Sequence, residues 1–340
     1  MDADWDQSSG AGTVKFPIMK LIKWLIRLGV MIAVVWGIAR FASGAREDLA
    51  QTGFDWREIR WQWLVLSGVI YAVGLTPACW FWRQILVALG QHPGVMETAR
   101  AYYVGHLGKY VPGKALVVII RTGLISGPRV DTTVAAVSIF IETLTMMAVG
   151  ACLAAVILIF QFPDSGLVLL AVALMLAAGV PTWPPLFRWL VAKLQVKRAN
   201  RGIEEALQGV DGRLMLRGWL SMTGGWCLLG LSLWAVMEAI PQVSSGTHQT
   251  LVDLPLFTAC VSLAMVAGFL SLLPGGVGVR ELVVMTLISV QPAYGPVVAI
   301  VSAVLLRFSW LMAELLVSAI LYLGWRGVPA SQVLGNSERG

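Results

Sequence analysis

Long apolar runs separated by short polar segments dominate this chain. The runs cover about residues 24–41, 62–82, 132–160, 165–185, 218–240 and 297–324. Most reach the roughly 18 apolar residues that cross a hydrocarbon core about 30 Å thick. Two further segments, 97–122 and 254–290, are apolar but are interrupted by Pro, Gly and charged residues. The pattern predicts an all-α, polytopic membrane protein with six full crossings and two broken, re-entrant segments.

The composition agrees with this prediction, because the chain lacks the polar surface that water requires. Of its 340 residues 57% are hydrophobic and 13% are charged, against roughly 25% charged residues in soluble domains. The four Cys lie in or beside apolar runs without close spacing, so we expect small buried side chains rather than disulfides or metal ligands. The net charge of +6 comes from basic residues beside the runs, which is typical of membrane topology rather than nucleic-acid binding.

The distribution of Lys and Arg predicts the orientation, since cytoplasmic loops of membrane proteins are enriched in these residues. The loop 186–217 is rich in both, whereas the loop 241–253 contains neither. We therefore expect the first loop in the cytoplasm and the second outside, with both termini cytoplasmic in the plasma (inner) membrane. The loop 42–61 is an exception, because it carries Arg on the predicted outer side.

The two broken segments occupy corresponding places in the chain. Pro112-Gly113 and Pro274-Gly275 are 162 residues apart, and similar Val-Ala…Val-Ser stretches at 134–138 and 298–302 are 164 apart. Three crossings and one broken segment per half would insert the second half upside down. This is the inverted-repeat plan of secondary transporters, whose substrate sites lie where broken helices meet. Two ordinary loops with Pro-Gly turns are the alternative.

This organisation predicts two transmembrane halves between two tails. The tails are residues 1–23, cytoplasmic, and 325–340; the halves are residues 24–160, with re-entrant segment 97–122, and 161–324, with re-entrant segment 254–290. The first run could also be a cleaved signal. A retained helix is favoured, because Trp36 and Arg40 are unusual just before a small-residue cleavage site.

The first broken segment combines helix-breaking residues with cations. The breaks are Gly108, Pro112 and Gly113, and the cations are Lys109, Lys114 and Arg121. Pro removes a backbone donor and Gly tolerates unusual dihedrals. A helix that restarts at such a break presents free N–H groups and a partial positive charge. The segment therefore suits a phosphate or another anionic headgroup, and the alternative is a set of ordinary cytoplasmic-loop cations.

The second broken segment contains more glycine. Its breaks are Pro274, Gly275, Gly276 and Gly278, and Arg280 and Glu281 follow directly. Unwound backbone at membrane depth persists only where it is buried in protein or lines a wet cavity. We therefore expect a functional re-entrant element here rather than an aqueous loop, with Arg280 as a fourth headgroup-binding cation.

Three charges fall inside predicted crossings, namely Glu142, Arg307 and Glu314. A charge at the centre of a membrane helix costs about 2.5–3.5 kcal/mol on insertion scales, so these side chains should face the bundle interior and have partners. We expect Glu142 to pair with a cation of the first broken segment. Glu314 or Glu281 should pair with Arg280 or Arg307. Structural ion pairs explain these charges as well as transport does.

No motif for metal, nucleotide or cofactor binding is present. The three His residues do not cluster, and there is no His-Glu-x-x-His pattern, paired Cys or phosphate-binding loop. We therefore expect no metal and no cofactor. His106 remains a weak candidate because of its position beside the Gly-Lys-Tyr turn.

At the two broken segments the sequence resembles the transmembrane-region family of lysylphosphatidylglycerol synthases, also described as flippase-like membrane proteins. The similar stretches are 108–114 with Arg121, and 274–281. The resemblance implies a polytopic fold with re-entrant elements and a role in handling anionic or glycosylated lipids. It does not imply aminoacyl transfer, which in the synthases belongs to a separate soluble domain. Relatives tend to carry Arg directly after the Glu at position 142, where this chain has Thr143.

The expected function is therefore the binding, and as a further step the flipping, of anionic or glycosylated membrane lipids by a non-enzymatic protein. One alternative is a membrane-embedded lipid glycosyl- or acyltransferase, for which Glu281 and His106 are the only candidate catalytic residues. Another is a scaffold for lipid-synthesis enzymes that uses the basic loop 186–217. Product formation from a sugar or acyl donor would favour the enzyme, and loss of function on neutralising the loop would favour the scaffold.

Overall fold

The computed structural model describes residues 56–110, 115–161, 209–244, 250–271 and 273–324, together with a few helical positions between 166 and 176. Within these ranges the regular secondary structure is helical. The elements are η1 (Trp56–Glu58), α2 (Trp61–Gly74), α3 (Thr76–Ala88), α4 (Val95–His106), η2 (Leu107–Tyr110), α5 (Ala115–Ile125), α6 (Thr132–Gln161), α10 (Gly212–Ala239), α11 (Pro241–Ser244), η5 (Thr250–Asp253), α12 (Leu254–Leu270), η6 (Pro274–Gly276), α13 (Val279–Ser289) and α14 (Gly295–Leu323).

Five helical stretches in the described part of the chain are long and apolar enough to cross a membrane. They are Trp61–Ala88, Thr132–Gln161, Gly212–Ala239, Thr250–Leu270 and Gly295–Leu323. The polytopic all-α prediction is therefore confirmed. Four of these stretches match predicted crossings, whereas Thr250–Leu270 was predicted as one arm of a broken segment. The predicted run 24–41 lies outside the described residues, and the run 165–185 lies mostly outside them.

Two helix boundaries differ from the sequence prediction, and a side-chain cap explains one of them. Helix α10 begins at Gly212 rather than at 218, because the side chain of Asp211 caps it by accepting a hydrogen bond from Leu214 N at 2.8 Å. Arg213 and Arg217 are therefore helical and not part of a loop. The first described span continues to Ala88, and a break at Leu75 divides it into α2 and α3.

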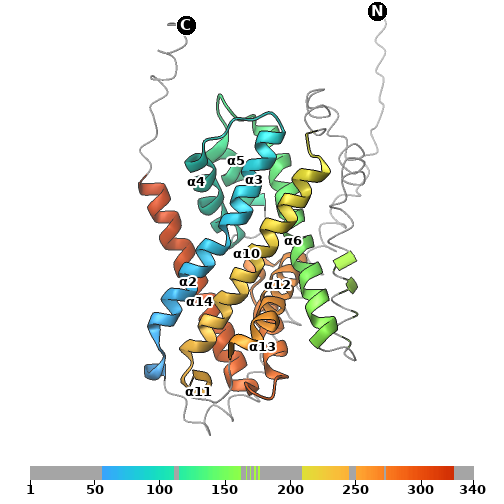
Figure 1. The fold of residues 1–340 in the computed structure, drawn as a ribbon. Helices are drawn as coiled ribbons and strands as arrows, with labels where there is room; N and C mark the ends of the chain where they lie inside the picture. The colour runs from blue at the N-terminus through green and yellow to red at the C-terminus, as the bar shows by residue number, and fades with distance from the viewer. Residues whose placement is uncertain are drawn as a thin grey trace, which may run out of the picture.

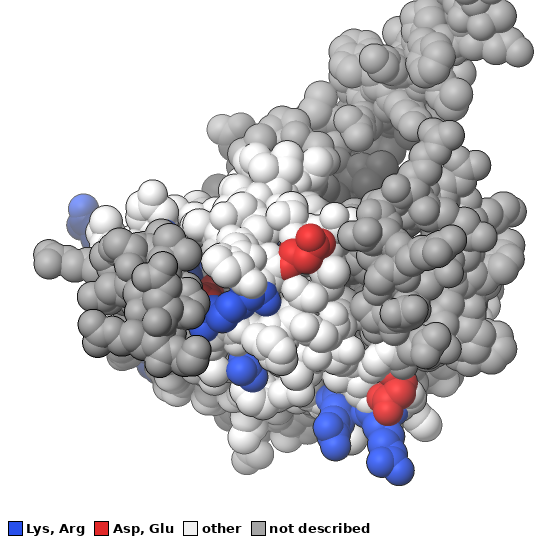
Figure 2. Space-filling model, turned by 90° about the horizontal axis from the view of Figure 1, so that it is seen from above, with Lys and Arg blue, Asp and Glu red and all other residues white. Residues whose placement is uncertain are grey.

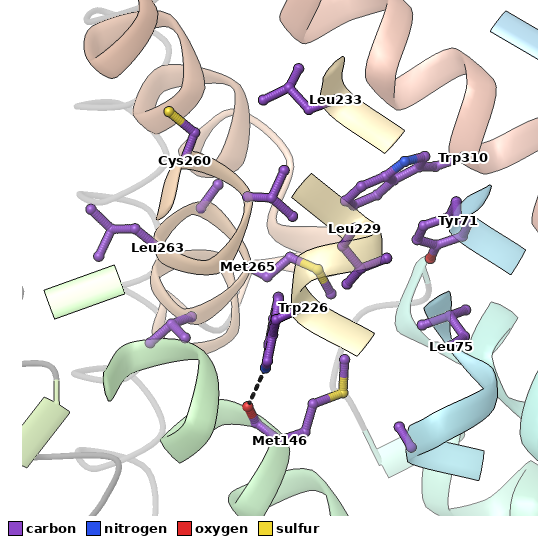
Figure 3. Close-up of a cluster of buried hydrophobic side chains, with 14 of the residues drawn as sticks. Tyr71, Leu75, Met146, Trp226, Leu229, Leu233, Cys260, Leu263, Met265 and Trp310 are labelled. Carbon is purple, nitrogen blue, oxygen red and sulfur yellow. Dashed lines mark hydrogen bonds between the residues drawn. The ribbon is translucent and has the colours of Figure 1, made fainter. Parts of the chain in front are cut away.

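The centre of the bundle is packed around α10. The Ser67 hydroxyl of α2 hydrogen-bonds the Ser232 hydroxyl of α10 at 2.8 Å, and Trp310 of α14 donates its indole N–H to the same Ser232 oxygen at 2.8 Å. Trp226 is fully buried and donates to the Met146 carbonyl at 3.1 Å (Figure 3). Gly150 leaves the space for that indole, since a Cβ there would lie 2.5 Å from the Trp226 ring. These contacts fix α2, α6, α10 and α14 relative to one another.

Two helical hairpins complete the fold. In Figure 1 the α4–α5 hairpin lies at the upper end of the bundle, and the α12–α13 hairpin lies at the lower end. Their turns, η2 and η6, meet near the middle, where a Cβ on Gly275 would lie 3.0 Å from the Tyr110 ring. The predicted upside-down insertion of the second half requires this arrangement. The inverted repeat itself and the domain limits stay predictions.

The turn of the second hairpin depends on glycine. Gly275, Gly276 and Gly278 have φ angles of 59°, 65° and 84°. Residues with a Cβ are strained in this left-handed region. The Pro274–Gly278 sequence therefore allows a tight reversal between α12 and α13 that ordinary residues would resist.

Candidate functional site

A cavity of about 410 Å³ lies between the two hairpins and α6. Its charged and polar lining comes from both hairpins and α6: Tyr102, His106, Lys109, Arg121, Glu142, Thr143 and Arg280. Much of the remaining lining is apolar, including Phe140, Met147 and Phe269. The cavity can therefore contact a charged group and hydrocarbon at the same time.

A buried ion pair joins α5 to α6 at the cavity. Arg121 Nη1 lies 2.8 Å from Glu142 Oε2, and the two residues are 3% and 1% exposed. Tyr102 donates its hydroxyl to the other Glu142 oxygen at 3.3 Å, and its ring centroid lies 4.0 Å from the Arg121 guanidinium carbon. Both charges are thus partnered inside the protein, which offsets much of the cost of burying them. Sequence reasoning expected Glu142 to meet a cation of the first broken segment, and Arg121 is that cation.

A second buried cluster surrounds Glu314 of α14. Its Oε1 oxygen accepts hydrogen bonds from Lys109 of η2 and from the Tyr71 hydroxyl of α2, and it lies 3.7 Å from His106 Nε2 of α4. The other oxygen, Oε2, is buried and has no hydrogen-bond partner. The pairing of Glu314 therefore differs from the predicted alternatives, since its cation comes from the first hairpin and is neither Arg280 nor Arg307. This contact ties the turn of that hairpin to α14.

A third pair fixes the second hairpin. Arg307 Nε of α14 lies 3.3 Å from Glu281 Oε1, which is one of the predicted pairings. The other Glu281 oxygen accepts the backbone N–H of Gly278 at 2.6 Å and so caps α13. Arg307 also donates from Nη2 to the Gly275 carbonyl at 2.8 Å. Glu281 and Arg307 are therefore occupied in holding the turn.

Arg280 differs from the other cations of the described cluster. Lys109, Arg121 and Arg307 each pair with a carboxylate. The Nε and Nη1 atoms of Arg280 are buried and have no hydrogen-bond partner. Its side chain extends past two glycines, because a Cβ on Gly268 or Gly276 would each lie 2.7 Å from it. An Arg held in a glycine-lined slot, lining a cavity and lacking a protein acceptor, is suited to receive an external one.

The predicted headgroup-binding residues differ in whether a carboxylate already pairs with them. Lys109 and Arg121 line the cavity but already have carboxylate partners, and Arg280 lines it without one. Lys114, Pro112 and Gly113 lie outside the described residues. Gly108 permits close packing of η2 on α5, since a Cβ there would lie 2.8 Å from Val117 N.

Sequence reasoning missed the tyrosines of the site. Tyr71 reaches Glu314 across 243 positions of sequence, and Tyr102 reaches Glu142 across 40. Nothing in a linear apolar pattern distinguishes a Tyr that faces a buried carboxylate from one that faces lipid. Among the described residues, no three His, Cys, Asp or Glu side chains gather as metal ligands would.

Comparison with known proteins places this arrangement in a family. A family model described as the lysylphosphatidylglycerol synthase TM region matches residues 24–318. The match covers both hairpins and every described long helix except the last residues of α14. A search of curated proteins found no match. The resemblance noted at 108–114 and 274–281 is therefore confirmed by a match over most of the chain.

Proposed function

The chain belongs to the lysylphosphatidylglycerol synthase TM region family, and from this premise we propose that it binds anionic membrane lipids in the cavity between its hairpins and moves them across the bilayer. Membership makes it a multi-pass membrane protein of a family concerned with lipids. The observation that carries the proposal is the unpartnered guanidinium of Arg280 in the cavity lining.

The charge balance of the described cluster favours an anionic ligand. The cluster has four cations and three carboxylates. Lys109, Arg121 and Arg307 each pair with one carboxylate, and Arg280 is left without one. A buried charge without a partner is costly. A lipid phosphate would remove that cost, because a guanidinium can bind phosphate oxygens in a bidentate, charge-assisted manner.

The apolar part of the cavity favours a lipid over a free anion. Side chains such as Phe140, Leu144, Met147, Phe269 and Leu273 share the lining with the cations. An inorganic anion would leave this apolar surface unused. A phospholipid headgroup at Arg280 would place the start of its acyl chains against these side chains. The volume of about 410 Å³ lies within the range of about 300–1,000 Å³ that is usual for small-molecule pockets.

The placement of the hairpins supports movement of the lipid as well as binding. They approach from opposite ends of the bundle and touch through η2 and η6 (Figure 1). In secondary transporters, broken helices of this kind meet at a central site that opens alternately to either side. Here the connecting contacts would be Lys109 with Glu314 and Arg307 with Gly275. The first contact joins the α4–α5 hairpin to α14, and the second joins the α12–α13 hairpin to α14. Breaking one contact while keeping the other would open the cavity toward one end.

The charge distribution supports a cytoplasmic location for the end that holds α4 and α5. Figure 2 looks onto this end and shows basic side chains at several places and fewer acidic ones. The second half of α3, helix α4, the connection between α5 and α6 and the start of α10 lie at or near this end (Figure 1). These segments contain Arg83, Arg100, Arg129, Arg213 and Arg217, whereas the described residues just before α2, at the opposite end, contain Arg57 and Arg60. By the positive-inside rule this end faces the cytoplasm. The same orientation would place both termini there.

Reconstituted vesicles provide the test. Fluorescent phosphatidylglycerol and phosphatidylcholine would be compared for binding and for flipping by wild type, Arg280→Gln and Arg129→Gln. Arg129 is the matched control because its side chain is 59% exposed and pairs with Glu97 away from the cavity lining. Loss of one charge-assisted contact should weaken phosphatidylglycerol binding in Arg280→Gln about ten- to a hundredfold, slow its flipping and leave Arg129→Gln unchanged.

Equal phosphatidylglycerol binding and flipping by wild type and Arg280→Gln would refute the assigned role. Equal binding and equal flipping of phosphatidylglycerol and phosphatidylcholine by the wild type would refute selectivity for anionic headgroups. Formation of a new lipid from an added sugar or acyl donor by the purified protein would instead support the enzyme alternative.

A further inference from the structure

The cluster around Glu314 contains more titratable groups than a structural ion pair needs. One carboxylate oxygen, Oε1, accepts from Lys109 and Tyr71 and has His106 Nε2 at 3.7 Å. His106 Nε2 also lies 3.4 Å from the Tyr71 hydroxyl. Lys109 alone already balances the charge of Glu314. The imidazole is therefore an additional basic group beside a carboxylate that still has a free, buried oxygen, Oε2.

Only part of this cluster reaches the cavity. His106 and Lys109 line it, whereas Glu314 and Tyr71 do not. The side chain of Glu314 is 2% exposed, and that of His106 is 12% exposed. His106 is thus the group through which a proton from the cavity could come under the influence of the buried carboxylate.

The titratable groups that face His106 come from several surrounding elements. They are the neutral hydroxyls of Tyr71 of α2 and Tyr102 of α4, and the charged side chains of Lys109 of η2, Arg121 of α5, Glu142 of α6, Arg280 of α13 and Glu314 of α14. Arg121 and Glu142 neutralise each other, as do Lys109 and Glu314. Burial is the largest opposition to protonation of His106, and among the like charges that add to it Arg280 is the one without a carboxylate partner. An anion bound to Arg280 would cancel this part of the opposition.

From this geometry we infer that His106, supported by Glu314, is a proton-binding site coupled to the lipid site, so that an anionic headgroup and a proton enter the cavity together. The inference rests on the proposed function and adds a co-bound ion to it. The protonated imidazole would donate from Nε2 toward Glu314 Oε1 or the Tyr71 hydroxyl. The proton comes from water and returns to water when the lipid leaves.

The coupling follows from linkage. If a bound anion makes His106 easier to protonate, then protonation must strengthen anion binding by the same factor. Histidine is the side chain that normally titrates between about pH 5 and 8, and no other cavity-lining group of the cluster does so ordinarily. Protonating Glu314 instead would leave Lys109 as an unpaired buried charge, which is costly.

A binding titration across this pH range tests the inference. Purified full-length protein in detergent would be titrated with short-chain phosphatidylglycerol, whose phosphate keeps its single charge, and with short-chain phosphatidylcholine as the neutral comparison. A pH-indicator dye in weak buffer would record protons taken up on binding. The variants are His106→Gln, which removes the titrating group, and His92→Gln, which makes the same change at an exposed His in the loop before α4.

Wild type and His92→Gln should bind phosphatidylglycerol more weakly as the pH rises, by up to about tenfold per pH unit for one linked proton. Both should take up protons on binding. His106→Gln should show neither effect and should bind at every pH about as wild type does at high pH. Phosphatidylcholine should cause no proton uptake.

Two results would overturn the coupling while leaving the proposed function intact: anion binding by wild type that is independent of pH without proton uptake, or unchanged pH dependence in His106→Gln. If His106→Gln fails to fold, the wild type still tests the coupling, because the absence of proton uptake on lipid binding overturns it. Failure of wild type to bind phosphatidylglycerol at any pH would overturn both proposals.

Discussion

Arg307 of α14 donates a hydrogen bond from Nη2 to the backbone carbonyl of Gly275 at 2.8 Å. This contact links a charge inside a long helix to the turn of the second hairpin. Tyr110 of the first hairpin lies against the same place, since its ring centroid is 5.6 Å from the Arg307 guanidinium carbon. The two hairpin turns and α14 therefore meet around one carbonyl group.

Gly275→Ala should disrupt this meeting point. A Cβ there would lie 2.9 Å from Arg307 Nη2 and 3.0 Å from the Tyr110 ring, at a φ of 59°. The left-handed backbone alone should cost about 1–2 kcal/mol, and the contacts should add to this. Thermal unfolding in detergent measures the loss. Gly295→Ala is the control, because its φ of 68° is similar but no atom lies within 4 Å of its Cβ position. Equal losses in both variants would show that the contacts at the turn are unimportant.

Arg121→Gln should destabilise the protein strongly, because it leaves Glu142 as a buried charge without its cation. Removing one partner of a buried pair typically costs about 3–5 kcal/mol. Arg129→Gln breaks a pair whose side chains are 59% and 29% exposed, and such pairs contribute about 0–1 kcal/mol. Unfolding in detergent should separate the two variants, and Arg121→Met with Glu142→Met should recover much of the loss. Similar small losses in both single variants would contradict a structural role for the buried pair.

Gly268→Ala should impair the lipid site more than the fold. A Cβ there would lie 2.7 Å from Arg280 Cγ and 2.8 Å from its Nε, so the flexible Arg side chain would have to move. Replacing a helical Gly with Ala otherwise favours the helix by about 0.5–1 kcal/mol. We expect an unchanged or slightly raised unfolding temperature with weaker phosphatidylglycerol binding.

Gly224→Ala is the matched control for that variant, because this α10 glycine has nothing within 4 Å of its Cβ position. It should keep normal lipid binding. Normal binding by Gly268→Ala as well would mean that the position of the Arg280 side chain does not matter.

Cysteine labelling should place the two hairpins at opposite membrane surfaces. Single cysteines at Gly127, after α5, and at Ala293, after α13, would be made in a chain whose four native cysteines are replaced by Ala. Both positions are exposed, and the two hairpins that they follow, α4–α5 and α12–α13, lie at opposite ends of the bundle (Figure 1). In intact cells an impermeant reagent should label Ala293→Cys only, and permeabilised cells should allow labelling of both. Labelling of both cysteines in intact cells would contradict the prediction that the two hairpins lie at opposite membrane surfaces.

Much of the architecture could be predicted from the order of residues. Four long runs became spans, and the breaks predicted at Gly108 and at Pro274–Gly278 lie at or beside the turns of hairpins. Apolar length and helix-breaking residues are local properties, so the sequence shows them directly. Helix ends were less accurate, as at Gly212, because a side-chain cap such as Asp211 decides them.

The sequence limited the possible partners of the buried charges but did not identify which cation pairs with which carboxylate. The cost of burying Glu142, Arg307 and Glu314 required partners, whatever the fold. Which cation meets which carboxylate depends on how helices distant in sequence pack together, as Lys109 and Glu314 do across 205 positions.

The sequence by itself therefore determined that this is a polytopic helical membrane protein with interior charges and two segments broken by glycine and proline. It could do so because the length of an apolar run and the dihedral preferences of Pro and Gly are local properties of the sequence. Only the tertiary structure decided that Lys109, Arg121 and Arg307 are paired while Arg280 lines a cavity unpaired, and that His106 lies beside Glu314. Pairing depends on distances between helices, and a linear pattern does not contain those distances.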